Sequence, residues 1–417
     1  MDEFKAAPLG FTSADVADLP RTRPQLRDFP TPIVTLSESA VAHNLATMAD
    51  WCAQAGVALA PHGKTTMSRE LWQRQLDAGA WGITVATPWQ ASVALGWGIP
   101  RVLLANALVQ PAALRALAPD ADRLTVWADS PRTVSIMTEA LTAADPSVPL
   151  AVLVELGGAH GRTGARGLEA ALAVAAAVAA SPVLRLAGVA GYEGALAHDA
   201  TAESLDRVQR YLEELLALHD AIEAAGLYPP DGPVILTAGG SAYFDQVADV
   251  LAPRRSAGGR GRDVEVLLRS GAYITHDDGF YRSITPLRRG PRGDGREFHA
   301  AIHGWATVVS RPEPGLVLVD AGKRDLPYDE GLPIPQAIRR YGEPVAVPLE
   351  GAVVSALNDQ HAFVLLPDDA AVEVGDVIRF GLSHPCTTFD KWRALAVVDD
   401  ALAGEPRVIG MVETNFG

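Results

Sequence analysis

Eight short apolar runs alternate with longer Ala/Leu/Glu-rich stretches over residues 57–268, and this alternation constrains the fold more than any other feature. The runs are expected as strands at 57–60, 82–86, 101–105, 124–128, 150–155, 186–192, 234–237 and 264–268. Helices are expected between them, for example at 66–78, 88–97, 131–144, 165–180 and 202–225. Strands that alternate with helices form parallel sheets, and eight of them close a (β/α)8 TIM-type barrel. An open doubly wound sheet is the alternative, but no Gly-x-Gly-x-x-Gly follows the first strand.

The character of the sequence changes after residue 285. Short alternating runs separated by turn residues, with no long helix between them, predict a mainly antiparallel β domain. These runs lie at 300–303, 306–309, 315–319, 345–347, 362–366, 377–380 and 395–398. An apolar run at 33–36 and a helical stretch at 39–55 precede the first barrel strand. We therefore expect a barrel over residues 30–285 and a β domain over 286–417, to which residues 1–29 are expected to contribute.

Charge and composition narrow the class of protein and its location. The net charge of −15 argues against nucleic acid or an anionic membrane as a partner. The Arg/Gly-rich stretch 254–262 is predicted to be a loop rather than a binding patch. Residues 1–5 lack the start of a signal peptide, and the apolar stretch 170–180 is too short to span a bilayer. Two cysteines make no disulfide framework, so a soluble, cytoplasmic protein is expected.

Lys64 follows the first barrel strand directly, in a loop punctuated by Pro61 and Gly63. Active sites of such barrels lie at the carboxyl ends of the strands. Desolvation there lowers the pKa of an amine, which makes Lys64 a candidate for Schiff-base chemistry. A solvated surface lysine is the alternative.

A second candidate feature is the turn Gly239-Gly240-Ser241, which is expected to open the helix after the seventh strand. Paired glycines let backbone N–H groups approach an anion, and barrels often bind a phosphate at this place. An imine-forming lysine together with a phosphate turn meets the two demands of pyridoxal phosphate. Taken alone, such a turn is usually only a turn. Other polar residues at the strand ends are Asn106, Glu155, His160, Arg162, Tyr192, His198, Asp277 and Asp278.

His384 and Cys386 form the third candidate feature, within the run Ser383 to Trp392. Imidazole and thiolate are zinc ligands, and residues two apart on an extended strand face the same way. An incomplete set of protein ligands would leave room for water or substrate, as a catalytic zinc requires. A packed cysteine beside a structural histidine is the alternative. By contrast, Asp320, Lys323 and Asp325 are interpreted as a polar turn.

These three features together resemble the D-serine dehydratase/D-threonine aldolase family. The resemblance rests on Pro61-His62-Gly63-Lys64-Thr65, on Gly239-Gly240-Ser241 and on the run Ser383 to Trp392, and it extends from about residue 29 to residue 417. It implies a fold-type III pyridoxal-phosphate enzyme with an alanine-racemase-like barrel and a β domain.

The resemblance also implies roles for individual residues. Lys64 would form the imine with the cofactor and would be the catalytic residue. His384 and Cys386 would bind Zn²⁺. The residues expected around pyridoxal phosphate besides Lys64 are Arg162, Tyr192, Thr237, Gly239, Gly240 and Ser241. The family is typically dimeric, so a homodimer is expected.

Two positions bear on the branch of the family. The aldolase branch is expected to carry an acidic residue where this chain has Cys386, which favours the dehydratase branch. The family often has histidine where this chain has Thr66, a difference that concerns the substrate more than the cofactor. The expected activity is therefore dehydration of a β-hydroxy D-amino acid such as D-serine, D-threonine or 3-hydroxyaspartate, which gives a 2-oxo acid and ammonia. Alternatives are retro-aldol cleavage to glycine and an aldehyde, racemisation, and a non-catalytic pyridoxal-phosphate carrier.

Overall fold

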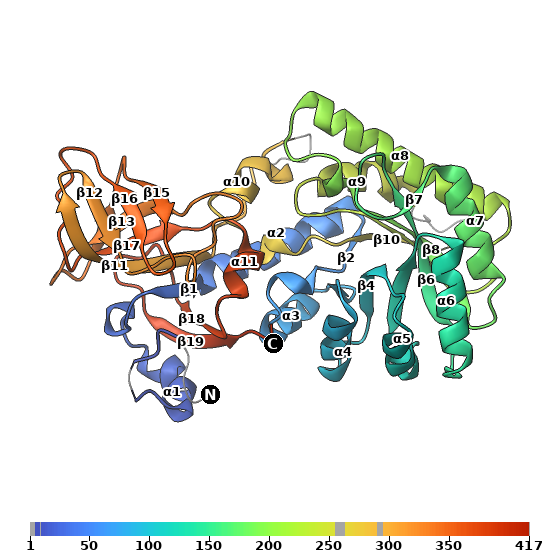
Figure 1. Ribbon diagram of the computed structural model, residues 1–417, viewed down its shortest axis with the longest axis horizontal. Helices are drawn as coiled ribbons and strands as arrows, with labels where there is room; N and C mark the ends of the chain where they lie inside the picture. Colours follow the sequence, from blue (N-terminus) through green and yellow to red (C-terminus); the bar gives the residue numbers. More distant parts are fainter. Residues whose placement is uncertain (1–4, 9, 255–262, 290–294, 417) are drawn as a thin grey trace.

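Two lobes make up the protein, a helix-ringed parallel barrel and an antiparallel β domain (Figure 1). The computed structural model describes residues 5–8, 10–254, 263–289 and 295–416. The predicted loop at 254–262 lies outside these residues except for Arg254, which ends a short 3-10 helix. The expected combination of a (β/α)8-type barrel with a β domain is confirmed.

Eight parallel strands form the barrel, in the order β2-β10-β9-β8-β6-β5-β4-β3. A parallel bridge between His62 and Thr84 joins the two ends of this order and closes the ring. A two-residue strand, β7 (Ala165–Arg166), pairs with β6 outside the ring. The ring strands are β2 (Ala58–Leu59), β3 (Ile83–Val85), β4 (Val102–Ala107), β5 (Leu124–Ala128), β6 (Leu150–Gly157), β8 (Leu184–Gly191), β9 (Val234–Thr237) and β10 (Val264–Leu268). Each matches a run that the sequence predicts as a strand.

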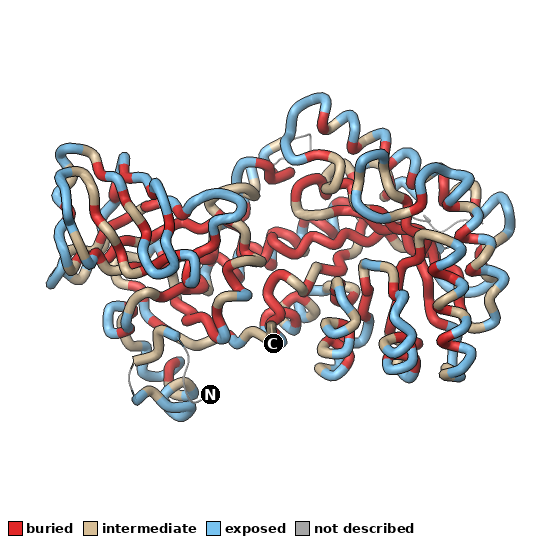
Figure 2. The backbone as a smooth tube through the Cα atoms, in the orientation of Figure 1, coloured by how far each residue is buried: buried red, intermediate tan, exposed pale blue. Residues whose placement is uncertain are grey.

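Helices surround the ring with one face on the strands and the other in solvent. Figure 2 shows the barrel strands as buried and the outer sides of the helices as exposed. Pro88, Pro111 and Pro131 stand at the first turns of their helices, where the missing N–H costs no hydrogen bond. The helices are α3 (Arg69–Asp77), α4 (Pro88–Gly96), α5 (Pro111–Leu117), α6 (Pro131–Thr142), α7 (Leu168–Ala179), α8 (Ala202–Ala224), α9 (Phe244–Leu251) and α10 (Phe280–Ile284).

The β domain is a second sheet that contains ten strands among the described residues. The predicted runs at 300–303 and 306–309 form one long strand, β11, because Gly304 lets Leu326 pack closely against it. The prediction missed β13, β15 and β19. Pro335 hides β13 from a pattern search, and it is tolerated because the pairing with β17 shifts register beside it. The strands are β1 (Ile33–Ser37), β11 (Ile302–Glu313), β12 (Leu316–Val319), β13 (Ile334–Arg339), β14 (Ala346–Pro348), β15 (Val353–Leu357), β16 (Ala362–Leu365), β17 (Val377–Gly381), β18 (Ala394–Val398) and β19 (Val408–Glu413).

The N-terminal part of the chain packs on the β domain. Strand β1 pairs with β11 and β18, so it belongs to the second sheet although it precedes the barrel in sequence. Helix α1 (Ser13–Thr22) contacts β19, and Leu19, Leu26 and Phe29 share an apolar cluster with Trp305. The chain then enters the barrel through α2 (Glu38–Ala55).

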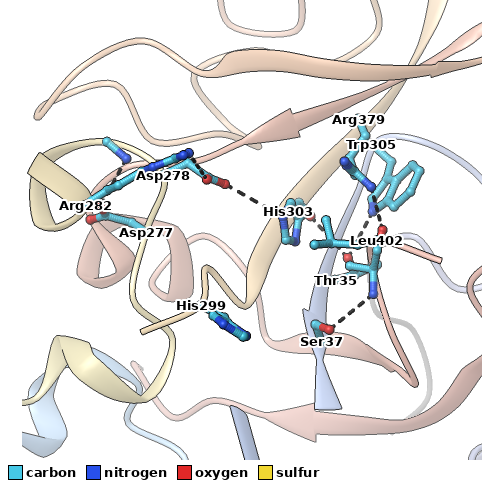
Figure 3. A network of polar contacts seen from close by, with 12 residues as sticks. Thr35, Ser37, Asp277, Asp278, Arg282, His299, His303, Trp305, Arg379 and Leu402 are labelled. Carbon is cyan, nitrogen blue, oxygen red and sulfur yellow. Dashed lines mark hydrogen bonds and ion pairs between the residues drawn. The ribbon is translucent and has the colours of Figure 1, made fainter. Parts of the chain in front are cut away.

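Polar residues of the second sheet lie close to the loop that follows the last barrel strand (Figure 3). Trp305 Nε1 donates to Thr35 Oγ1 at 3.0 Å across the β1–β11 pair. His303 on β11 lies 3.8 Å from the Asp278 carboxylate, which belongs to the loop after the last barrel strand. The first contact lies within the second sheet, and the second places that sheet next to a loop after the last barrel strand.

Among the residues that the structure describes, no helix combines the length and the apolar character needed to cross a bilayer.

Candidate active site

A cavity of about 270 Å³ opens at the carboxyl ends of the barrel strands. The barrel contributes Lys64, Arg162, Tyr192 and Arg269 to its wall, among other residues. The β domain contributes Glu330, His384 and Cys386. The three candidate features of the sequence therefore meet in one place, although the first and the last of them lie more than 300 residues apart along the chain.

Lys64 reaches this cavity because the chain turns tightly after β2. Residues Gly63–Thr65 form a 3-10 turn, and for this reason α3 begins three residues later than predicted. A side chain at Gly63 would approach Trp72 within 2.5 Å, so only glycine fits under the turn. Burial lowers the pKa of the Lys64 ammonium; Cys386 opposes this effect, whereas Arg162 and Arg269 add to it. A lowered pKa favours the free amine that imine formation and proton transfer require.

His62, two residues before Lys64, is a half-buried histidine that lines the same cavity. Burial lowers its pKa well below the usual value, and the cations Lys64 and Arg269 act in the same direction. Its Nδ1 atom is buried without a hydrogen-bond partner. His62 can therefore adjust the surroundings of Lys64 without carrying a charge.

The Gly239-Gly240-Ser241 turn departs from its expected geometry. Gly239 and Gly240 donate their backbone N–H groups to the carboxylate of Glu193, at 2.9 and 2.7 Å. Helix α9 begins only at Phe244, so the expectation that the turn opens the helix is wrong. The physical reason is that a buried carboxylate from the loop after β8 already accepts these donors. Ser241 keeps its position at the cavity, where its hydroxyl accepts the Ala272 N–H at 3.2 Å.

Replacing Glu193 with alanine is expected to lower the free energy of unfolding by about 2–4 kcal/mol, because two buried N–H donors lose their acceptor. Glu193 is fully buried. Urea denaturation of the cofactor-free protein measures the loss. The variant Glu193→Gln retains one acceptor oxygen and should lose about half as much. Equal stability of the alanine variant and the wild type would contradict this structural role.

Arg269 is a site residue that the sequence analysis missed. It follows β10 directly, is 4% exposed, and donates to Thr237 Oγ1 at 2.6 Å and to the Gly191 carbonyl at 2.5 Å. Its guanidinium also lies over the Trp127 ring, 4.9 Å from the centroid. Thr237 is fully buried and is not among the residues that line the cavity, and its hydroxyl orients Arg269; its expected place beside a cofactor stays a prediction. The signal in the sequence was a cation directly after a predicted strand.

Tyr192 and Arg162 both line the cavity, as expected. The Arg162 guanidinium lies 4.8 Å from the centre of the Tyr192 ring. Burial raises the pKa of Tyr192, and Glu193 adds to this effect, so the phenol keeps its proton and can donate a hydrogen bond. A protonated phenol and a guanidinium thus stand together on one wall.

His384 and Cys386 lie side by side, but not on a strand as predicted. His384 has a left-handed backbone (φ +54°) and precedes the short helix α11 (Pro385–Phe389), because Pro385 favours a first helical turn. Cys386 Sγ lies 3.5 Å from Thr65 Oγ1, next to Lys64. Burial alone would raise the pKa of the Cys386 thiol, but hydrogen bonds from His384 and Thr65 outweigh it and lower that pKa.

Asp329 is the partner that orients His384, and no pattern in the sequence points to it. Its carboxylate accepts a 2.5 Å hydrogen bond from His384 Nδ1 and a 2.7 Å bond from the Thr387 hydroxyl. Since Nδ1 is occupied, Nε2 is the nitrogen left to bind a metal ion. Metal-binding histidines commonly have such a carboxylate partner.

Several polar residues at the predicted strand ends do not line this cavity. Asn106, Glu155 and His160 are among them, whereas His198 does line it. Asp277 caps α10 by accepting the Tyr281 N–H at 2.9 Å, and it also accepts the His384 N–H at 3.2 Å. It therefore supports the site from behind rather than facing it.

The fold and the cavity define a barrel protein with a half-buried lysine at a strand end, which is the arrangement of an imine-forming enzyme. Residues 36–249 match the family model of the alanine racemase N-terminal domain, and residues 301–398 match that of a serine dehydratase domain. The chain belongs to the alanine racemase-like, fold-type III family of pyridoxal-phosphate enzymes with a D-serine dehydratase-type domain.

Relatives within this family carry two different lyase names. The chain is 29% identical to a D-threonine aldolase of Arthrobacter sp. over 89% of its own length and 90% of the relative's. It is 25% identical to a D-threo-3-hydroxyaspartate dehydratase of Delftia sp. (strain HT23), over 88% of its own length and 94% of the relative's. The solved D-threonine aldolase of Filomicrobium marinum superimposes with a TM-score of 0.76 at 28% identity, over 95% of this chain and 98% of that one.

The residues present fit pyridoxal phosphate, the cofactor of the family. Lys64 offers an amine whose pKa is lowered, and Ser241, whose hydroxyl oxygen accepts the Ala272 N–H, still has its own hydroxyl proton to donate to a phosphate in the same cavity. A side chain at Gly271 would approach the His62 carbonyl within 2.5 Å, so the backbone stays bare beside this donor. Gly239 and Gly240 contribute less to phosphate binding than expected, because Glu193 already accepts their N–H groups.

The donor chemistry also fits zinc in part. His384 Nε2 and the Cys386 thiol are suitable zinc ligands. Within the described ranges, no group of three or more His, Cys, Asp or Glu side chains is arranged to hold a metal ion. A zinc ion here would thus have two protein ligands, and its other positions would be left for water or substrate.

Proposed function

We propose that the protein is a zinc-assisted, pyridoxal-phosphate-dependent dehydratase of β-hydroxy D-amino acids. The observation that carries the proposal is the contact between Cys386 Sγ and Thr65 Oγ1 at 3.5 Å. Through this contact a soft metal-binding pair stands next to the amine of Lys64. Serine would give pyruvate and ammonia, threonine 2-oxobutanoate and ammonia, and 3-hydroxyaspartate oxaloacetate and ammonia.

Lys64 carries out the proton transfer in this proposal. Its amine would hold the cofactor and, once free, would take the proton from the substrate α-carbon. Burial and the neighbouring Arg162 and Arg269 favour the neutral amine that a base requires. The cofactor, when bound, supplies a conjugated ring that accepts the electron pair left on the α-carbon.

The other lining residues hold and orient the reactants. The Ser241 hydroxyl would donate to the phosphate, and Tyr192 with Arg162 would flank the ring. Arg269 is held by Thr237 and by the Gly191 carbonyl, so its guanidinium is fixed in place before any ligand enters. A donor fixed in this way needs no reorganisation during the reaction.

His384 and Cys386 are proposed to hold zinc, whose Lewis acidity would make the β-hydroxyl a better leaving group. Hydroxide otherwise leaves poorly at neutral pH. Asp329 keeps the His384 ring oriented, and Thr65 lies beside the Cys386 sulfur. Two protein ligands leave open the positions that a substrate hydroxyl needs.

Retro-aldol cleavage is the second candidate, and the aldolase names of four relatives favour it, two of them 3-hydroxy-D-aspartate aldolases of Paracoccus denitrificans. That reaction needs a base for the β-hydroxyl proton. The resemblance leads us to expect an acidic residue at position 386 in aldolases, whereas this chain has a cysteine. For this reason we place dehydration first.

Product analysis tests the proposal. The protein, loaded with pyridoxal phosphate and Zn²⁺, is given D-serine, D-threonine and 3-hydroxyaspartate, with the L-enantiomers as controls. We expect equal amounts of 2-oxo acid and ammonia from at least one D-substrate. Glycine and acetaldehyde from D-threonine, with no 2-oxobutanoate, would show an aldolase. Conversion of D-serine to L-serine would show a racemase, and no turnover of any D-substrate would point to a carrier.

The expected cytoplasmic location and the expected homodimer remain predictions.

A further inference from the structure

The described residues before α1 include a lysine that reaches across to the β domain. Lys5 Nζ donates to the Asp325 carboxylate at 2.8 Å and to the Arg324 carbonyl at 2.8 Å. The same amine lies 4.2 Å from the centre of the Trp392 ring. Three contacts of the Lys5 side chain therefore hold the N-terminal segment against a part of the β domain that lies about 320 residues later in the sequence.

The contact with Asp325 is unusual because that carboxylate is nearly inaccessible. Its side chain is 2% exposed. The Asp325 Oδ2 atom accepts hydrogen bonds from two neutral donors, Gly322 N–H at 3.0 Å and Gln360 Nε2 at 2.9 Å. The Oδ1 atom is bonded to the Lys5 ammonium. A buried carboxylate without a cation is strongly disfavoured, so Lys5 stabilises this conformation of the loop.

The loop that Asp325 anchors leads directly to the candidate zinc site. Leu326 is 1% exposed and Pro327 is buried, so the first half of the link to Asp329 is packed, while Tyr328 and Asp329 are exposed. The Asp325 carbonyl is also held, by Trp392 Nε1 at 2.9 Å. Four residues after Asp325, the Asp329 carboxylate accepts the 2.5 Å bond from His384.

We propose that Lys5 is a positioning residue for the active site: by neutralising buried Asp325 it holds the 321–330 loop so that Asp329 orients His384. The inference rests on the proposed function only in the assignment of His384 as a metal ligand. A loop displaced by even 1 Å would lose the His384–Asp329 bond, and loss of such an outer partner typically weakens metal binding about 10- to 100-fold.

The test uses full-length variants and two measurements besides activity. Lys5→Met keeps the apolar stem over Trp392 but removes the charge, and Lys5→Arg keeps the charge. Arg324→Ala removes an exposed cation from the same loop, whose guanidinium forms an ion pair with exposed Asp359, and serves as the matched control. Zn²⁺ affinity is measured by competition with a chromophoric chelator, and hydrogen exchange reports on peptides that cover residues 321–330.

We expect Lys5→Met to weaken Zn²⁺ binding about 10- to 100-fold and to speed hydrogen exchange in residues 321–330. The variant Asp329→Asn, which alters the partner of His384 directly, should weaken Zn²⁺ binding as well. Pyridoxal-phosphate absorbance should stay unchanged, since the barrel wall is untouched. Lys5→Arg should recover most of the affinity, and Arg324→Ala should retain it. Wild-type affinity and exchange in Lys5→Met would overturn the proposal.

The same experiment separates this inference from the proposed function. If the wild type bound no Zn²⁺, the metal assignment would fail, while the exchange measurement would still test whether Lys5 holds the loop. Fast exchange in Lys5→Met would then support the anchoring role, and unchanged exchange would overturn it.

Discussion

Lys64→Ala is expected to lower turnover of a β-hydroxy D-amino acid by about 10,000-fold or more. The substitution removes both the covalent link to the cofactor and the base that takes the α-proton, and the second contribution alone is typically worth 100- to 10,000-fold. The cavity keeps its phosphate donor, so the variant should still bind pyridoxal phosphate, but without a covalent bond. Its absorbance should therefore be that of the free aldehyde rather than of an imine.

Borohydride reduction followed by peptide mapping checks this directly. The chain has four lysines, Lys5, Lys64, Lys323 and Lys391, so the labelled residue can be assigned without ambiguity. Lys64 lines the cavity, whereas Lys323 is exposed on the β domain and Lys323→Ala is the matched control. A reducible imine that persists in Lys64→Ala would refute the assignment of the cofactor lysine.

Cys386→Ala is expected to reduce release of 2-oxo acid by about 100- to 1,000-fold while the imine absorbance is kept. Cys386 is one of the two protein groups that would hold zinc, and without the metal ion the hydroxide leaves unassisted; losing one strong electrostatic contribution to a transition state typically costs this much. Metal analysis of the purified variant should show bound zinc falling well below one ion per chain.

Cys52→Ala provides the control for this variant. Cys52 is the other cysteine of the chain and is buried in α2, where burial raises its thiol pKa to about 12. That substitution affects packing and leaves the site intact, so its zinc content and turnover should remain near the wild-type values. If Cys386→Ala kept its activity after exhaustive chelation, the zinc-assisted mechanism would be wrong and a metal-free reaction such as racemisation would become the better account.

The barrel strands were predictable because their burial on both faces makes them short, continuous apolar runs. Val264–Leu268 and Leu124–Ala128 match their predicted bounds for this reason. In the β domain, strands are exposed on one side and interrupted by residues such as Pro335. The alternation is therefore weaker there, and β13, β15 and β19 were missed.

The candidate site was predictable only where a residue stands at a characteristic place in its own element. Lys64 directly after a strand and the His384–Cys386 pair are such cases, and each carries a local signal. Glu193, Arg269 and Asp329 act through partners 46, 32 and 55 residues away. No periodicity or spacing connects such pairs, because folding alone brings them together.

The chain by itself determined the succession of strands and helices, the barrel class and the reactive groups, since these follow from local polarity and side-chain chemistry. The tertiary structure decided which donors remain free for a ligand. It showed that Glu193 already accepts the Gly239 and Gly240 N–H groups, that Thr237 supports Arg269, and that Asp325, within the predicted polar turn, is buried and bonded to Lys5. The physical reason is that hydrogen bonds and buried charges depend on distances of a few ångströms between distant segments, and only the folded chain sets those distances.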